Sequence, residues 1–181
     1  VVWYLGYDQG NLYLAMDSPC PEGTWPVARV RPEDALEQSI DYPLLHDDHV
    51  EIQFGTYGRD KASLGGYGFY KILANARGAL SDKHWHNGTP GSEELWEYGG
   101  DIACRVADNA WRMELRVPLR AIGIARPEGP DGFRMPVQLV RADSSGGPYF
   151  AGWVGGTWMA WDDFGEIVLD PAAPAFRFRT M

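Results

Sequence analysis

Alternation of apolar and polar residues with a period of two is the feature that most constrains the fold of this chain. In residues 111–118, WRMELRVP, every second side chain is apolar, and residues 49–55, HVEIQFG, follow the same pattern. Successive side chains of a strand point to opposite faces, so both segments are predicted to be half-buried strands. Further strands are predicted at Val2–Tyr7, Leu12–Met16, Phe69–Ala74, Asp101–Ala107, Arg134–Arg141 and Gly165–Leu169.

Turn signals join these strands into hairpins, and helix signals are few. The segments YDQGNLY and ADNAWRM place short Asp, Asn and Gly turns between strand pairs. Helical turns are predicted only within RPEDALEQ and PLRAIG. This pattern predicts an all-β fold, an antiparallel β-sandwich of the immunoglobulin-like or jelly-roll-like kind with little helix. The expected long loops are Asp17–Asp48, Ala76–Gly100 and Asp143–Phe164.

The length of 181 residues favours one main domain, which we place at residues 1–170. Residues 171–181 are expected to be a linker or the start of a neighbouring element. The chain opens on a strand-like run without an initiator Met, so we interpret it as a piece of a longer protein. The two cysteines are Cys20, in a turn, and Cys104, predicted to point into the core. We expect free thiols rather than a bridge between them.

The charge balance limits the classes of partner. The formal net charge is −9, and an acidic surface repels nucleic-acid phosphates and anionic lipids. Nucleic acid and membrane are therefore not expected as partners, whereas neutral or cationic ligands remain. The uncharged run at residues 144–161 contains five glycines and Pro148, which is typical of a loop and not of a membrane-spanning helix.

A tryptophan-rich loop is the first candidate site. Trp153, Trp158 and Trp161 lie among glycines in GWVGGTWMAWDDFG. Flat, rigid aromatic rings can stack on the apolar faces of sugar rings, and neighbouring glycines let them stand clear of the backbone. The alternative is that these rings plug the end of the core. Trp85 and Trp96 are further candidates for an aromatic surface or for loop plugs.

Polar candidates lie around the strand at residues 49–55. Glu51 lies on its polar face, where a carboxylate can accept hydrogen bonds from sugar hydroxyls, and Lys71 could donate to an oxygen-rich ligand. Asp47 and Asp48, between two histidines, are candidate calcium ligands, although a solvated loop is the simpler interpretation. The sequence contains no nucleophile elbow, phosphate loop, CxxC or HExxH motif, so we do not expect an enzyme.

Four segments in order, VVWYLGYDQGNLYLAMDS, DDHVEIQFG, WRMELRVPLRAIGI and FGEIVLD, resemble carbohydrate-binding module family 9. The resemblance spans about Val2 to Asp170. It implies an antiparallel sandwich attached to a glycoside hydrolase or another secreted polysaccharide-degrading enzyme. It also implies that sugar chain ends are bound between two tryptophans. Structural calcium, the only cofactor in question, is known in the family.

The resemblance assigns site residues one by one. The sugar-contacting Glu of the family falls on Glu51, and a basic residue of the next strand falls approximately on Lys71. One sandwiching tryptophan would come from the loop before the last strand, as Trp153, Trp158 or Trp161. The position of the other is Leu45, which predicts weaker binding because one stacked ring contributes about 1–3 kcal/mol. Trp85 or Trp96 could replace the missing ring from a neighbouring loop.

Three functional hypotheses follow. The first is a non-catalytic carbohydrate-binding module of a secreted, periplasmic or cell-surface protein, with carbohydrate and a neighbouring catalytic domain as partners. The second is a structural sandwich that braces a catalytic domain without binding sugar, motivated by Leu45 and by Phe176 and Phe178 near the end of the chain. The third is a haem-binding relative, for which Met159 and the four histidines are the obvious axial ligands.

Overall fold

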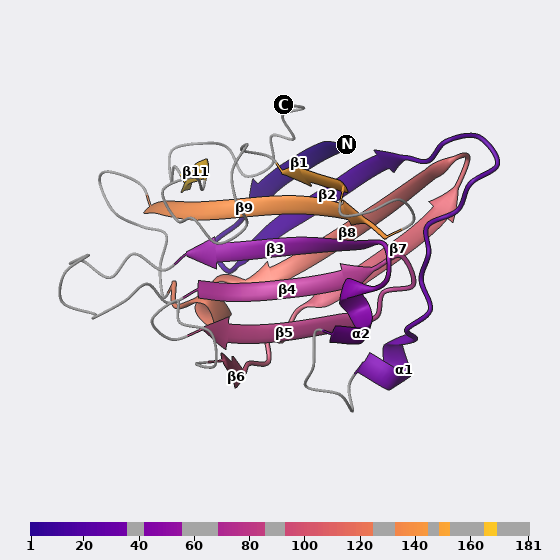
Figure 1. The fold of residues 1–181 in the computed structure, drawn as a ribbon. Coiled ribbons are helices and arrows are strands. Elements are labelled where there is room, and N and C mark those ends of the chain that lie inside the picture. Colours follow the sequence, from indigo (N-terminus) through magenta and orange to yellow (C-terminus); the bar gives the residue numbers. More distant parts are fainter. Residues whose placement is uncertain are drawn as a thin grey trace.

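Two antiparallel β-sheets face each other in the computed structural model (Figure 1). The structure describes residues 1–35, 42–55, 69–85, 93–124, 133–144, 149–152 and 165–169. Helices are few and short in these ranges. The predicted all-β sandwich is therefore confirmed.

The first sheet has four strands in the order β1-β2-β8-β7. Their bounds are β1 Val2–Tyr7, β2 Asn11–Pro19, β7 Asp101–Ala107 and β8 Ala110–Pro118. Asp108 and Asn109, between β7 and β8, both have φ of 55°, the left-handed conformation that a tight two-residue hairpin turn requires. Between β1 and β2, the Asp8 carboxylate accepts hydrogen bonds from the backbone N–H groups of Gly10 and Asn11. Both predicted hairpins are confirmed.

The second sheet has seven strands, and β9 lies at its branch point. β9 pairs with β3 along one edge and with β10 and β11 along the other. The bounds are β3 His49–Gly55, β4 Phe69–Asn75, β5 Leu80–Trp85, β6 Glu93–Leu95, β9 Phe133–Asp143, β10 Tyr149–Gly152 and β11 Gly165–Leu169.

Two of the predicted loops contain strands, so these predictions were wrong. β5 and β6 lie within Ala76–Gly100, and β10 lies within Asp143–Phe164. The sequence of β5, LSDKHW, has no apolar alternation, but its backbone pairs with β4 over six residues. Pairing to a neighbouring strand has overridden the local pattern there.

The helical elements are short. α1 (Pro32–Ala35) and the 3₁₀ helix η1 (Leu119–Ile122) begin where helical turns were predicted, whereas α2 (Tyr42–Leu45) was not predicted. In the ranges that the structure describes, no helix has the length and hydropathy needed to cross a bilayer.

The main core fills the space between the sheets. It is formed by apolar side chains of the facing strands, including Leu12, Leu14, Met16, Trp111, Met113, Leu115, Val50, Ile52, Phe54, Val137 and Leu139. Cys20 and Cys104 pack against this core as free thiols. The prediction that β3 is half-buried was wrong, because all seven of its residues are buried. β3 is a central strand of its sheet, and its second face is also covered.

Candidate functional site

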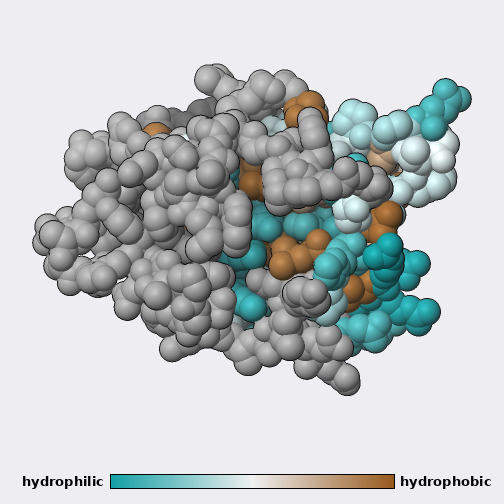
Figure 2. Space-filling view, in the orientation of Figure 1, coloured by the Kyte–Doolittle hydropathy of each residue, from teal (hydrophilic) through white to brown (hydrophobic). Residues whose placement is uncertain are grey.

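A row of polar side chains lies on the face of β3 that points away from the main core. His49, Glu51 and Gln53 alternate with the core residues of this strand. Lys71 of β4 and Gln138 of β9 are the register partners of Gln53 on either side. All five side chains are buried. Figure 2 views this face and shows hydrophilic and hydrophobic atoms together over the middle of the sheet.

Glu51 is the centre of this polar cluster. Its Oε2 atom lies 3.8 Å from Nζ of Lys71 and accepts a hydrogen bond of 3.2 Å from Nε2 of Gln53. Its Oε1 atom lies 3.5 Å from Nε2 of His49. The structure therefore brings together Glu51 and Lys71, the two residues that the sequence singled out as polar sugar contacts. Both are only 3% exposed, so the cluster is more enclosed than the sequence predicted.

His49 and Gln53 belong to the same cluster; the sequence offered His49 only as a candidate metal or haem ligand, and Gln53 was missed. Their signal in the sequence was the spacing of two residues on either side of Glu51. Nδ1 of His49 lies 2.8 Å from the backbone carbonyl of Asp47 and must donate to it, because a carbonyl oxygen only accepts. Nε2 of His49 and Oε1 of Gln53 are buried and have no hydrogen-bond partner within the described part of the chain. Leaving such atoms unsatisfied costs about 1–3 kcal/mol each, which a hydroxyl-bearing ligand would offset.

The ionisation of Glu51 gives a testable pH dependence. Burial raises the pKa of its carboxyl, but the neighbouring side chains of His49 and Gln53 and the charge of Lys71 outweigh burial, so the pKa lies below its usual 4.5. Because the folded pKa is depressed, this group stabilises the fold fully above pH 4.5, and the contribution is lost as the pH falls through the folded pKa. Urea unfolding of the wild type and Glu51→Gln should therefore show a stability difference that is constant from neutral pH down to about 5 and shrinks in more acidic buffer. A difference that grows on acidification would contradict this assignment.

Asp47 anchors the chain that precedes α1. Its Oδ1 accepts a hydrogen bond of 2.9 Å from the backbone N–H of Arg29, and its Oδ2 accepts one of 3.0 Å from that of Val30. The side-chain amide of Asn75 donates a third, of 2.9 Å, to Oδ2. The carboxylate is fully buried and its oxygens are occupied by donors.

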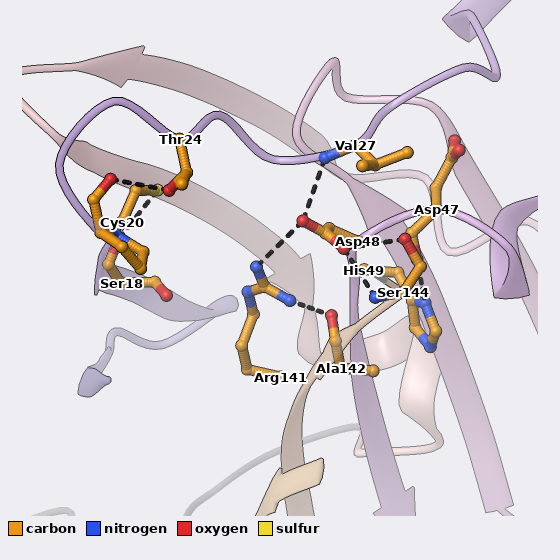
Figure 3. A network of polar contacts seen from close by, with 11 residues as sticks. Ser18, Cys20, Thr24, Val27, Asp47, Asp48, His49, Arg141, Ala142 and Ser144 are labelled. Atoms are coloured by element: carbon orange, nitrogen blue, oxygen red, sulfur yellow. Dashed lines mark hydrogen bonds and ion pairs between the residues drawn. The ribbon is translucent and has the colours of Figure 1, made fainter. Parts of the chain in front are cut away.

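Asp48 makes a second anchor on the other side of the strand (Figure 3). Its Oδ2 accepts the backbone N–H of Val27 at 3.0 Å and lies 3.5 Å from the Arg141 guanidinium. Its Oδ1 accepts both the backbone N–H and the hydroxyl of Ser144, at 2.7 and 2.9 Å. Arg141 also donates to the carbonyl of Ala142 and lies over the Trp111 ring, 4.8 Å from its centroid.

The donor contacts of Asp47 and Asp48 do not fit the candidate calcium site. Their oxygens are directed at N–H and O–H donors, whereas a calcium site requires several oxygens directed at one point. Within the described ranges, no group of three or more His, Cys, Asp or Glu side chains could hold a metal ion. The pair acts as a structural clamp for the loop that follows β2.

The structure describes some of the predicted aromatic residues and leaves others, with the candidate haem ligand Met159, outside the described ranges. Trp153, Trp158, Trp161, Phe176, Phe178 and Met159 lie outside the described residues, and of Trp85 only the backbone, in β5, is described. Trp96 is half-buried against the core, and its Nε1 donates a 3.0 Å hydrogen bond to the carbonyl of Ala121. Trp96 thus takes part in the structural packing. Leu45, at the end of α2, is 41% exposed.

The histidines considered as haem ligands have other contacts where they are described. His49 is held by the carbonyl of Asp47, and the ring of His84 is stacked on Tyr70 with centroids 4.3 Å apart. His86 lies outside the described residues.

One exposed aromatic residue was missed entirely. Trp25 lies in the loop between β2 and α1, and its side chain is 65% exposed. Its neighbours are Thr24 and Pro26, so the sequence signal was a tryptophan within a turn-forming segment rather than within a strand pattern.

Solved structures share this architecture. A family 9 carbohydrate-binding module from Caldicellulosiruptor kristjanssonii, solved with glucose, matches 96% of this chain and 78% of its own, with a TM-score of 0.56 and 14% identity. The chain has the fold of a family 9 carbohydrate-binding module. A family 9 module from the same organism, solved with cellotriose, matches 94% of this chain and 75% of its own, with a TM-score of 0.56 and 15% identity.

A third structure agrees with this fold. A protein from Bacteroides uniformis, provisionally assigned as carbohydrate-binding, matches 93% of this chain and 77% of its own, with a TM-score of 0.61 and 12% identity. No protein-family model matches the sequence, and no curated protein matches it either. The family 9 module fold is therefore recognised by structure, at 12–15% sequence identity.

Proposed function

We propose that this chain is a non-catalytic carbohydrate-binding module. The observation that carries the proposal is the match of more than nine-tenths of the chain to family 9 modules, one solved with glucose and one with cellotriose. The polar cluster agrees with it, since Glu51 and Gln53 offer acceptors and Lys71 offers a donor, the combination that neighbouring sugar hydroxyls require. In this proposal, Trp153, Trp158 or Trp161 supplies a stacking ring. Trp85 is a further candidate for this role, on strand β5, which pairs with the strand β4 that carries Lys71.

The context of the module is part of the proposal. Family 9-like modules imply a larger secreted, periplasmic or cell-surface protein in which a neighbouring catalytic domain acts on polysaccharide. The net charge of −9 agrees with a neutral sugar as the ligand, because anionic glycans would be repelled.

Isothermal titration calorimetry with glucose, cellotriose and a panel of other neutral oligosaccharides tests the proposal. Wild-type protein should bind at least one of them saturably, and Glu51→Gln should weaken that binding by about 10- to 100-fold, because hydrogen bonds to a charged group contribute roughly 1.5–3 kcal/mol. The matched control is Glu114→Gln, at an exposed glutamate of β8, and it should bind like the wild type. Equal affinity of both variants would exclude Glu51 from the site.

A brace for a neighbouring domain is the second candidate function. The burial of Glu51 and Lys71, each 3% exposed, favours it, because an ion pair closed off from solvent can serve the fold alone. If folded wild-type protein gives no heat of binding with any sugar of the panel, the result would contradict the carbohydrate-binding proposal and support a bracing role.

A further inference from the structure

Trp25 is exposed, whereas the other tryptophan side chains that the structure describes are buried or half-buried. Four tryptophan side chains are described, and of these Trp3 and Trp111 are buried and Trp96 is half-buried. Tryptophan is highly buried on average because water is a poor solvent for its large apolar ring. The 65% exposure of Trp25 therefore sets it apart from the other described tryptophans and leaves its ring accessible to a ligand.

The loop that carries Trp25 is fixed before the ring by a turn. The backbone N–H and the hydroxyl of Thr24 both donate to the carbonyl of Pro21, at 3.0 and 2.7 Å. Pro26, directly after Trp25, restricts its own φ and the conformation of the residue before it.

The loop is fixed after the ring by the two buried aspartates. Two hydrogen bonds join Val27 and Asp48. The backbone N–H of Val27 donates to the Asp48 carboxylate at 3.0 Å, and the backbone N–H of Asp48 donates to the carbonyl of Val27 at 2.7 Å. Two further backbone N–H groups, at residues 29 and 30, donate to Asp47. An exposed ring on a fixed backbone binds with little further loss of conformational entropy, which is the property of a preformed contact surface.

The ring lies at the end of the sandwich where β3 begins. In Figure 1 the loop after β2 passes along this end towards α1, beside α2. Asp48 alternates with the core residue Val50, so Val27, which Asp48 holds, lies on the core side at the start of β3 and not over the polar face that carries Glu51. The backbone of Trp25 is nevertheless within roughly 25 Å of the backbone of Glu51. The path between them runs two residues along the loop to Val27, across the hydrogen bonds to Asp48, and three residues along the strand to Glu51.

A second exposed apolar side chain belongs to the segment that leads into the same two aspartates. Leu45, which is 41% exposed, lies two residues before Asp47, just as Trp25 lies two residues before Val27. The two aspartates thus hold both segments at one end of the sheet. Figure 2 shows pale and hydrophobic atoms gathered at this end beside hydrophilic ones.

We propose that Trp25 is an accessory stacking residue for a neutral oligosaccharide or polysaccharide chain. It would contact a sugar unit beyond the one held at Glu51, and so favour long chains over single sugars. The inference rests on the proposed carbohydrate-binding function, and it adds a residue that neither the sequence motifs nor the fold comparison indicated.

Calorimetry with glucose, cellotriose and cellohexaose on the wild type, Trp25→Ala and Trp25→Phe tests this inference. Trp25→Ala should bind glucose like the wild type but cellohexaose about 5- to 100-fold more weakly, since a stacked ring contributes roughly 1–3 kcal/mol. Trp25→Phe keeps a flat ring and should retain most of the affinity. Val168→Ala, at an apolar side chain in β11 that is 46% exposed, is the matched control and should change nothing.

The outcomes separate this inference from the function on which it rests. Equal binding of cellohexaose by Trp25→Ala and the wild type would overturn the role of Trp25 and leave the module proposal standing. Absence of wild-type binding to all three sugars would overturn both for this class of glycan. Circular dichroism of each variant should match the wild type, because the replaced side chains are exposed.

Discussion

Replacing Asp48 with Ala should destabilise the fold by about 3–5 kcal/mol, a large share of the stability of a domain of this size. The change removes the acceptor for the backbone N–H groups of Val27 and Ser144. It also leaves the Arg141 guanidinium buried beside the core without the Asp48 carboxylate. Burial lowers the pKa of Arg141 and the negative charge of Asp48 opposes that shift, so the carboxylate stabilises a charge that burial penalises. Urea unfolding monitored by circular dichroism measures the loss.

An exposed ion pair provides the matched control for Asp48. Asp17 of β2 lies 3.4 Å from the Arg112 guanidinium of β8, and both side chains are well exposed. Because exposed ion pairs contribute little, Asp17→Ala should change the free energy of unfolding by at most about 0.5 kcal/mol. If Asp48→Ala and Asp17→Ala had equal effects, the clamp would not hold the loop. Arg141→Met in the Asp48→Ala background should recover part of the loss, since it removes the uncompensated charge.

The sequence predicted the parts of this fold that depend on local pattern. Alternation in WRMELRVP places Trp111, Met113 and Leu115 on one face, and all three are in the core. The Asp-Asn turn at residues 108–109 adopts the left-handed conformation that these residue types tolerate. Only the family resemblance suggested that Glu51 and Lys71 belong to one site. Local pattern does not show which residues of two separate strands lie side by side in the folded sheet.

The rest depended on contacts between segments that are distant in the chain. β5 has no apolar alternation and exists because β4 offers it a paired edge. The Asp47-Asp48 sequence resembles a solvated or metal-binding loop, and only the folded structure shows backbone N–H groups from residues 27, 29 and 30 directed at it. For the same reason the sequence did not single out Trp25, since its exposure and the hydrogen bonds that hold its loop depend on the tertiary structure.

The Glu51-Lys71 pair has the second large expected effect. Glu51→Leu should destabilise the fold by roughly 3–5 kcal/mol, because Lys71 would lose a carboxylate 3.8 Å from its ammonium in a buried position. Lys71→Met should also be destabilising, since among the contacts described for Glu51 those with His49 and Gln53 would remain without a neighbouring positive charge from Lys71. The double variant should cost clearly less than the sum of the two single changes, because an apolar pair removes both buried charges at once. Strict additivity in urea unfolding would show that the two groups do not interact.

The same cycle distinguishes a brace from a binding site. A pair that serves the fold alone is replaceable, so the double variant would regain stability and lose nothing else. A pair that also holds sugar hydroxyls is not replaceable, because Leu and Met neither accept nor donate hydrogen bonds. If the proposed function holds, the double variant should therefore recover stability towards the wild type while its binding to any sugar that the wild type binds falls at least about 10-fold. Retained affinity in a refolded double variant would place the sugar elsewhere on the module, and would make this buried pair a structural feature of the sheet.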